Sequence, residues 1–276
     1  MPDANPPHPD GDRAQLASSF GGVATHYERF RPGPPVEAVD WYLPLPVTRV
    51  VDIGAGTGAL SRLLVGRADE VVAVEPDDRM RAVLVAENPG VSALSGTGEA
   101  MPLDDGCADV VLASTSWHWM DPDAAVREAA RVLVPGGYLG TLWTGADPDG
   151  PFLSEARARI AGAGAGAASD VGELAGLAER MVQTDAYSLT IPDGAPFDTP
   201  EHATFAWDIA LDSDELIGLL GTFSWVITMP EERRMALLDE ARAMLVAFGI
   251  VGSATVDVAW TTDAWRARRE DTGGRS

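Results

Sequence analysis

The chain has 276 residues, 46% of them hydrophobic, which suits one large domain or one domain with an insertion. Its formal net charge of −22 at pH 7 disfavours nucleic acid and anionic membranes as partners, because both are densely negative. Every basic residue is arginine and the one cysteine is Cys107, which excludes lysine Schiff-base chemistry, a P-loop lysine and an internal disulfide.

Residues 1–20 are proline-rich and predict a disordered arm. They lack the basic and apolar regions of a signal peptide, and no apolar run approaches the ~20 residues of a membrane span, so we expect a cytoplasmic protein. Residues 21–276 are expected to form one domain. Its core is expected over about 47–145 and 200–276, with a helical, lid-like insertion over about 146–200.

The first predicted strand, near 49–53, runs into a glycine-dense turn, and a helix near 58–66 leads to a second strand near 70–75. At Gly54 and Gly56 a Cβ would hold the turn away from a ligand, and glycine also tolerates positive φ. Glu75 closes the second strand, where a carboxylate can accept both hydroxyl hydrogens of a ribose. This arrangement predicts a nucleotide pocket.

Two classes of cofactor fit this pocket. Gly54-x-Gly56-x-x-Ala59 matches a relaxed dinucleotide fingerprint, with Glu75 about 20 residues downstream. Asp52 before the turn and a third glycine at Gly58 favour the other class of cofactor, which the resemblance given below identifies. The absence of lysine also removes the tyrosine–lysine pair of short-chain dehydrogenases, which weakens the nicotinamide interpretation.

Downstream, apolar runs alternate with helical patterns, as in a parallel sheet covered on both faces. The expected strands lie near 91–95, 108–113 and 137–143, and the expected helices near 77–87 and 122–133. The sequence therefore predicts an α/β, Rossmann-like, doubly wound and mostly parallel seven-stranded sheet. Such a sheet brings the ends of its first, second and fourth strands to one edge, where open α/β sheets bind ligands.

The pattern loosens after Gly145. Residues 151–200 are expected to form the helical insertion, either a lid or an inert linker, with a low-complexity stretch over 161–168. A strand is expected over 204–210, then a helix capped near Asp212 or Ser213. Thr228 and Glu231 have capping-box spacing for a helix over 230–248. Residues 256–260, a turn and Trp265 are expected to complete the final strand.

Several motifs together resemble the class I S-adenosylmethionine (SAM)-dependent methyltransferases. Asp52-x-Gly54-x-Gly56-x-Gly58 resembles their motif I, and residues 96–106, 108–119 and 131–139 resemble the segments around the later strands. The Trp117-His118-Trp119 loop and residues 25–33 look most like the trans-aconitate methyltransferase-like branch. The resemblance is strong over about residues 20–145 and weak elsewhere.

The resemblance implies a set of cofactor-binding residues. Asp52, Gly54, Ala55 and Gly56 would shape the site for the amino-acid end of SAM, and Glu75 with Pro76 would hold the ribose. The adenine would lie at Thr97, Gly98 and Glu99, and the methyl group near Ser114 to His118. Tyr27 and Arg31 match positions that fold over the cofactor; the alternative for Arg31 is a surface salt bridge with Glu28 or Glu37.

The acceptor half of the site is less defined. His118 is the candidate catalytic base, since its ordinary pKa suits proton transfer near neutrality, and the alternative is a histidine packed between its tryptophan neighbours. Trp117, Trp119, Phe223 and Trp225 could form an aromatic acceptor pocket facing the sulfonium, or belong to the core. No ligand spacing indicates a metal.

The sequence thus favours a SAM-dependent methyltransferase acting on a small molecule through an oxygen, nitrogen or carbon nucleophile, a carboxylate included. Three alternatives stay open: a cyclase that uses SAM as scaffold or substrate, an NAD-dependent oxidoreductase, and a non-catalytic SAM-binding protein. The sequence leaves the oligomeric state undetermined.

Overall fold

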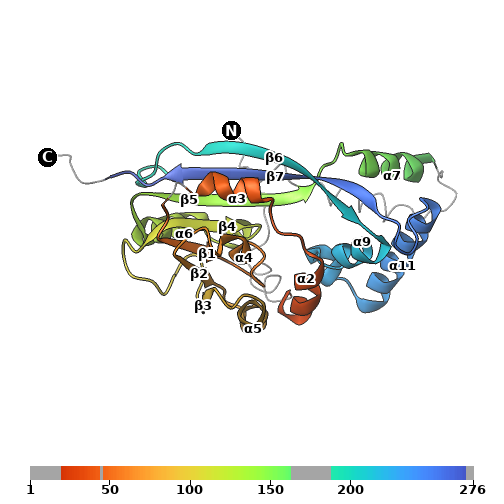
Figure 1. Ribbon diagram of the computed structural model, residues 1–276, viewed down its shortest axis with the longest axis horizontal. Coiled ribbons are helices and arrows are strands. Elements are labelled where there is room, and N and C mark those ends of the chain that lie inside the picture. Colours follow the sequence, from red (N-terminus) through yellow and green to blue (C-terminus); the bar gives the residue numbers. More distant parts are fainter. Residues whose placement is uncertain (1–19, 44–45, 163–187, 272–276) are drawn as a thin grey trace.

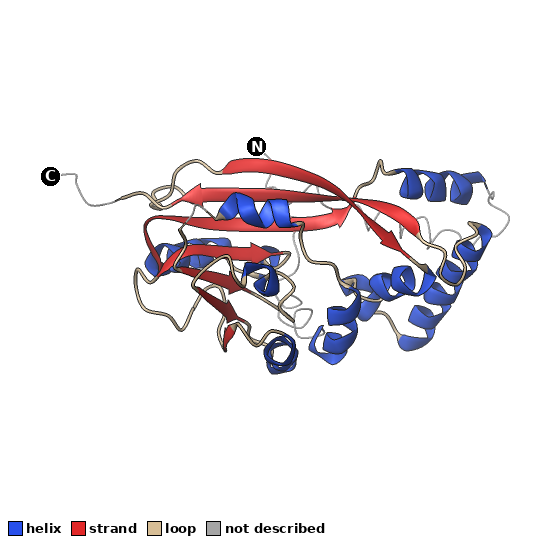
Figure 2. Ribbon diagram, viewed as in Figure 1, coloured by secondary structure: helices blue, strands red, loops and turns tan. Residues whose placement is uncertain are grey.

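A computed structural model describes residues 20–43, 46–162 and 188–271, and it is built on one seven-stranded sheet (Figures 1 and 2). The strands are β1 (Arg49–Ile53), β2 (Glu70–Val74), β3 (Ser92–Leu94), β4 (Ala108–Ser114), β5 (Leu133–Ala146), β6 (Glu201–Leu211) and β7 (Val256–Arg268). Their order is β3-β2-β1-β4-β5-β7-β6. β1 to β5 are parallel, and β7 runs antiparallel to β5 and β6. The expected α/β, mostly parallel seven-stranded sheet is confirmed.

Helices cover both faces of the sheet. The described helices are α2 (Ala24–Phe30), α3 (Val36–Tyr42), α4 (Ser61–Leu64), α5 (Asp78–Glu87), α6 (Pro122–Val132), α7 (Pro151–Gly162), α9 (Ser213–Leu220), α10 (Ser224–Ile227) and α11 (Glu231–Ala247). On one face, Tyr42 and Leu64 pack with Val50 in the cluster under α3 and α4. On the other, α6 packs against the alternate strand residues, such as Val51. This alternation follows from the two-residue period of a strand.

A third cluster lies beyond the parallel strands. The distal parts of β5, β6 and β7 extend past β4 and carry α7, α9, α10 and α11 (Figure 1). Trp260 is the largest fully buried side chain in this region. No helix within the described ranges is both long and apolar enough to cross a membrane.

Three elements differ from expectation. The helix expected over 58–66 is a series of turns followed by the four-residue α4. The turn expected after Trp260 does not exist, because its β-branched threonines continue β7 to Arg268 and pair with β5. The capping box at Thr228 and Glu231 is also wrong. Pro230 is the N-cap of α11, and the Thr228 hydroxyl donates to the Ser224 carbonyl over 2.9 Å.

A capping box is present one helix earlier. The Asp212 side chain accepts from the backbone of Glu215 over 2.9 Å, and the Glu215 side chain accepts from the Asp212 N–H over 2.9 Å. The expected cap at Asp212 is thus confirmed. Asp121 caps α6, and its side chain accepts from the Ala124 N–H over 2.8 Å.

The domain boundaries are still predictions. The arm expected over 1–20, apart from Phe20, and most of the low-complexity stretch lie outside the described residues. Of the expected insertion, α7 is described, and Leu189 and Phe197 are buried in the cluster beside α6.

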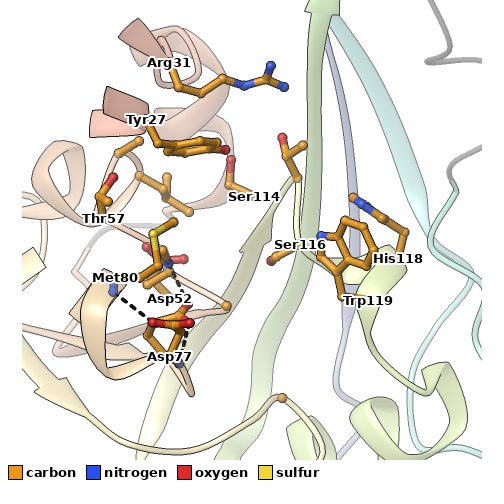
Figure 3. A pocket seen from close by; sticks show the side chains of 18 of the residues that line it. Tyr27, Arg31, Asp52, Thr57, Asp77, Met80, Ser114, Ser116, His118 and Trp119 are labelled. Carbon is orange, nitrogen blue, oxygen red and sulfur yellow. Dashed lines mark hydrogen bonds between the residues drawn. The ribbon is translucent and has the colours of Figure 1, made fainter. Parts of the chain in front are cut away.

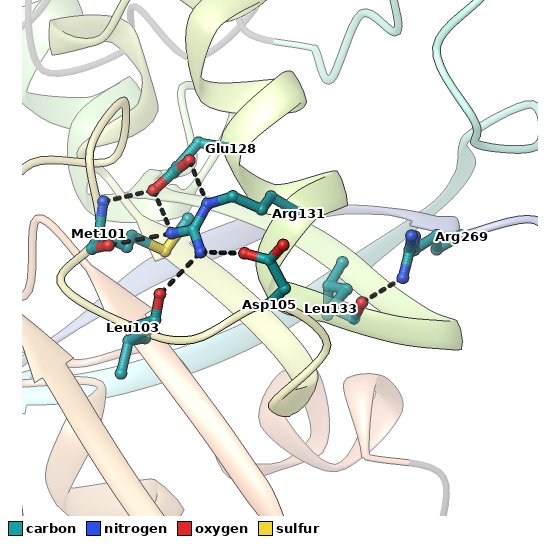
Figure 4. A network of polar contacts seen from close by, with 7 residues as sticks. All are labelled: Met101, Leu103, Asp105, Glu128, Arg131, Leu133 and Arg269. Carbon is teal, nitrogen blue, oxygen red and sulfur yellow. Dashed lines mark hydrogen bonds and ion pairs between the residues drawn. The ribbon is translucent and has the colours of Figure 1, made fainter.

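Arg131, near the end of α6, holds the segment that follows β3 (Figure 4). Its guanidinium donates to the carbonyls of Met101 (3.1 Å) and Leu103 (2.7 Å) and pairs with Asp105 (2.7 Å). Glu128 pairs with Arg131 over 2.7 Å and accepts from the Met101 N–H over 2.7 Å. The guanidinium beside Glu128 lowers the pKa of that carboxyl. This network fixes the segment in which the adenine site was predicted.

Candidate active site

The glycine turn after β1 is fastened to the end of β2. Gly54, Gly56 and Gly58 have φ angles of 61°, 59° and 94°, which glycine adopts without a Cβ penalty. The Gly54 N–H donates to the Val74 carbonyl over 2.9 Å, and the Gly56 N–H donates to Glu75 Oε2 over 2.8 Å. The structure therefore brings together the turn and the acid that the sequence singles out.

Glu75 is buried, 7% exposed, with both carboxylate oxygens in use. Oε2 accepts from Gly56, and Oε1 accepts from the Asp77 N–H over 2.9 Å. A carboxylate offers about four lone-pair positions, so each oxygen can still accept from a ligand hydroxyl. Burial raises the pKa of Glu75, although the two backbone amides oppose the shift.

Asp52 supplies a second buried carboxylate and lines the cavity. Its Oδ2 accepts from the Ser61 hydroxyl over 2.6 Å, whereas Oδ1 has no hydrogen-bond partner within the described residues. Burial raises the pKa of Asp52 to about 7; the Ser61 hydroxyl opposes this shift and the charge of Glu75 adds to it. A buried acceptor without a donor needs an explanation, and a ligand ammonium group would provide one.

The loop at the end of β4 packs directly against the glycine turn. The Ser116 hydroxyl donates to the Ile53 carbonyl over 2.8 Å. A Cβ built on Gly54 would lie 2.7 Å from Ser116 Cβ, so the packing of this loop by itself requires glycine here. Thr115, with φ of 52°, is the only non-glycine residue of the described chain in the left-handed region. Strained backbone of this kind often occurs at functional sites.

The segment after β3 lines the cavity and packs against the end of the loop that follows β4, since a Cβ added to Gly98 would clash with Met120 Sδ. Thr97 and Ala100 exchange backbone hydrogen bonds of 3.4 and 3.2 Å, which fold the segment into a tight turn. Glu99 Oε1 accepts from the Asp121 N–H over 2.8 Å, at the start of α6. Glu99 therefore has a structural bond as well as a place at the cavity.

Arg31 and Phe223 lie together at the cavity, one after α2 and the other before α10. The Arg31 guanidinium carbon is 4.8 Å from the centre of the Phe223 ring. No ion pair of Arg31 is present in the described parts of the chain, and Glu28 pairs with Arg62 instead. The alternative of a salt bridge between Arg31 and Glu28 is thus wrong.

These residues surround one cavity of about 600 Å³, a volume typical of small-molecule sites. Figure 3 shows Asp52, Asp77 and Met80 on one side of it, and His118 and Trp119 on the other. The predicted site residues that line it are Tyr27, Arg31, Asp52, Gly54, Ala55, Gly56, Glu75, Pro76, Thr97, Gly98, Glu99, Ser114, His118, Trp119 and Phe223. Within the described residues, the structure thus assembles a single pocket from segments far apart in sequence.

Two predicted acceptor residues do not line this cavity. Trp117 is 5% exposed and belongs to the core beside α6, because the short 3₁₀ turn over Trp117–Trp119 turns it away from its neighbour. Trp225 packs in the cluster under α11. Placing either tryptophan in the acceptor pocket was wrong. The His118 and Trp119 rings remain together, with centroids 4.5 Å apart.

The structure adds lining residues that the sequence reasoning missed: Thr57, Met80, Met120, Thr144, Thr222 and Ser224. Thr57 Oγ1 is buried and, like Asp52 Oδ1, has no partner among the described residues. Met80 and Met120 could have been suspected, because each follows a strand end at the ligand edge. Thr222 lies in a turn between α9 and α10, and no pattern in the sequence indicates it.

Two other histidines have structural contacts. His26 Nε2 lies 2.9 Å from the Gly218 carbonyl, and His202 pairs with Asp263 over 3.0 Å and stacks on Trp265. No described residue of 146–162 or 188–200 lines the cavity. The described residues also contain no group of three or more potential metal ligands.

Comparison with known proteins agrees with this geometry. A family model described as a methyltransferase domain matches residues 51–141. An uncharacterized methyltransferase of Mycobacterium tuberculosis is 40% identical over 233 residues, covering 84% of this chain and 88% of the relative. A malonyl-[acyl-carrier protein] O-methyltransferase of Methylococcus capsulatus is 32% identical, covering 50% and 54%. The solved structure of a proposed type II methyltransferase from Anaeromyxobacter dehalogenans has a TM-score of 0.62 at 24% identity, covering 87% and 98%, and shares the fold.

Proposed function

The chain belongs to the class I SAM-dependent methyltransferases, and on that premise we propose that it methylates a small-molecule acceptor in the cavity at the carboxyl edge of its sheet. Family membership removes the nicotinamide interpretation of the glycine turn. The observation that carries the proposal is that one cavity contains both the Glu75 carboxylate and the unpartnered Oδ1 of Asp52.

The cofactor half fits SAM group by group. Asp52 Oδ1 can accept from the ammonium group, and the bare backbone of Gly56 leaves room beside it, since the nearest atom to an added Cβ is Met80 Cε at 3.5 Å. Glu75 can accept from the ribose hydroxyls. Thr97, Gly98 and Glu99 line the predicted adenine end, and Tyr27, Ala55, Pro76 and Ser114 line the same cavity. When bound, SAM supplies an activated methyl group for in-line displacement.

The acceptor half contains His118, Trp119, Phe223 and Arg31. We propose His118 as the base that takes a proton from a hydroxyl, amine or carbon acid during attack. A carboxylate acceptor is already ionised and needs no base. Trp119 and Phe223 offer aromatic surface to the acceptor and to the sulfonium charge.

The finer assignment is also a proposal. The Trp117-His118-Trp119 loop and residues 25–33 support placement in the trans-aconitate methyltransferase-like branch. The partly matching relative named as an O-methyltransferase of malonyl-[acyl-carrier protein] supports an oxygen nucleophile. The net charge of −22 supports small molecules rather than nucleic acid or membranes as partners, and we propose a cytoplasmic enzyme. Neither a metal nor a second cofactor is required for this chemistry.

The test is product analysis over an acceptor panel of hydroxyl, amine, carbon-acid and carboxylate compounds. A methyltransferase yields S-adenosylhomocysteine (SAH) and methylated acceptor in equal amounts. Consumption of SAM without SAH or a methylated product would instead indicate a cyclase with SAM as substrate, and a cyclised acceptor with SAM unchanged would indicate a cyclase with SAM as scaffold. Tight SAM binding without turnover over the whole panel would indicate a binding protein.

A further inference from the structure

Three side chains on adjacent strands form a hydrogen-bond chain that ends at the cavity. Trp207 Nε1, on β6, lies 3.2 Å from Thr262 Oγ1 on β7, and this oxygen lies 3.1 Å from Thr144 Oγ1 on β5. Thr144 and Thr262 are directly opposite in the β5–β7 register. Thr262 is fully buried, whereas Thr144 is 8% exposed and lines the cavity.

The Trp207 indole sets the direction in which the hydrogen bonds run. An indole N–H can only donate, so Thr262 accepts from Trp207. The buried Thr262 hydroxyl then has one available acceptor within the described residues, Thr144 Oγ1. If Thr144 donated instead, the Thr262 proton would be buried without an acceptor, which is unfavourable. Thr262 therefore donates to Thr144, and the Thr144 proton is directed away from Thr262, toward the cavity.

Thr144 lies in the acceptor half rather than the cofactor half. β5 is three strands away from β2, whose end carries Glu75, a separation of about 14 Å at the usual strand spacing. Leu142 on β5 pairs with Ser114, the last residue of β4. Thr144 is two residues further along β5, beside the loop at the predicted methyl position. The same cavity is lined by the aromatic rings of Trp119 and Phe223.

We propose that Thr144 is a specificity-determining hydrogen-bond donor that selects acceptor molecules presenting a carbonyl-type oxygen toward β5. Thr262 and Trp207 are positioning residues, because they fix the direction in which Thr144 donates. That the bound molecule is a methyl acceptor rests on the proposed function. The hydrogen bond that Thr144 donates does not depend on SAM. A group that can only donate gains nothing from the Thr144 proton.

The test compares two aromatic probes of the same planar shape, acetophenone and α-methylstyrene, which differ in a C=O against a C=CH₂. Ligand-observed NMR titration gives the dissociation constant of each, with and without SAH. The ratio of the two constants reports the preference for the oxygen. Comparing that ratio between variants cancels the different hydration of the probes.

Thr144→Val removes the hydroxyl at nearly constant shape, and the preference for acetophenone should fall about 2- to 10-fold, the usual effect of a neutral hydrogen bond. Thr144→Ser should retain it. Trp207→Phe, outside the cavity, should reduce it in part. The Thr262 oxygen then lacks its indole donor, so a bond from Thr144 to Thr262 becomes closer in energy to the reverse bond. Thr222→Val is the matched control, since the Thr222 hydroxyl already donates to the Leu219 carbonyl over 2.6 Å.

An unchanged ratio in Thr144→Val, or an equal loss in Thr222→Val, would contradict the proposal. Failure of the wild-type protein to bind acetophenone would also contradict it. If SAH does not bind while the ratio still depends on Thr144, the proposed function fails and the donor site stands. Melting temperatures near that of the wild type confirm that the variants are folded.

Discussion

The backbone amide of Gly56 donates to the Glu75 carboxylate over 2.8 Å, so the glycine turn and the acid form one unit. The bond spans the ends of two parallel strands, β1 and β2. It leaves the rest of the carboxylate available to a ligand, because each oxygen accepts from only one backbone amide. The geometry of the cofactor half depends on this unit.

Gly54 and Gly56 should respond differently to alanine, although their φ angles are nearly equal. Gly56→Ala adds a Cβ in ordinary contact with Met80 Cε at 3.5 Å, so the left-handed backbone should be its main cost, about 1–2 kcal/mol of unfolding free energy. Gly54→Ala should cost more, because its Cβ lies 2.7 Å from Ser116 Cβ. Denaturant unfolding measures both; equal losses would contradict the role given to Ser116.

SAM affinity should depend on pH through Asp52. The pKa of Asp52 is raised to about 7, so the group must lose a proton before it can pair with an ammonium. SAM binding should therefore tighten from about pH 6 to about pH 8, with proton release detectable by calorimetry in buffers of different ionisation enthalpy. Asp52→Asn is the control and should bind weakly with no such dependence. A wild-type affinity that is constant over this range would rule out the pairing.

The same group should affect the stability of the ligand-free protein in the opposite sense. Because burial raises the pKa of Asp52 from 3.8 to about 7, the native protein binds more protons than the unfolded chain between these values, and Asp52 costs stability as pH rises through this window. Asp52→Asn should therefore gain stability over the wild type with rising pH, by up to about 4 kcal/mol above pH 7. Urea unfolding at about pH 5 and pH 8 measures the difference.

His118→Ala should reduce turnover of a hydroxyl or amine acceptor by ~10²–10⁴ while SAM affinity changes little. His202→Ala is the matched control, because this histidine pairs with Asp263 and does not line the cavity. Initial rates with the acceptor found by the panel provide the measurement. A loss below tenfold would show that His118 shapes the pocket without exchanging protons.

The cofactor half of the site could be predicted because it follows from local patterns. Parallel strands place their carboxyl ends at one edge, so Asp52 and Glu75 had to lie near each other. The wrong assignment of Trp117 has a different origin. Successive residues in a short 3₁₀ turn point in different directions. The sequence does not reveal whether Trp117 or Trp119 packs in the core.

Elements held by tertiary contacts were the least predictable. Residues 55–60 form turns that Glu75 holds at Gly56, and the flanking Ile53 and Ser61 are held by Ser116 and Asp52. The helical pattern of the segment does not show these contacts. The continuity of β7 through Thr261 and Thr262 depends on pairing with β5, a strand more than 100 residues earlier. Thr144 could have been found by applying the strand-end rule to the fifth strand as well.

The most direct test of the central claim is calorimetric titration of SAH into the wild-type protein and Glu75→Ala. The account predicts binding by the wild type and a loss of about 1–3 kcal/mol in the variant, because charged hydrogen bonds to the ribose disappear. A variant that is folded and binds SAH as tightly as the wild type would show that the cofactor does not lie against the Gly56–Glu75 unit.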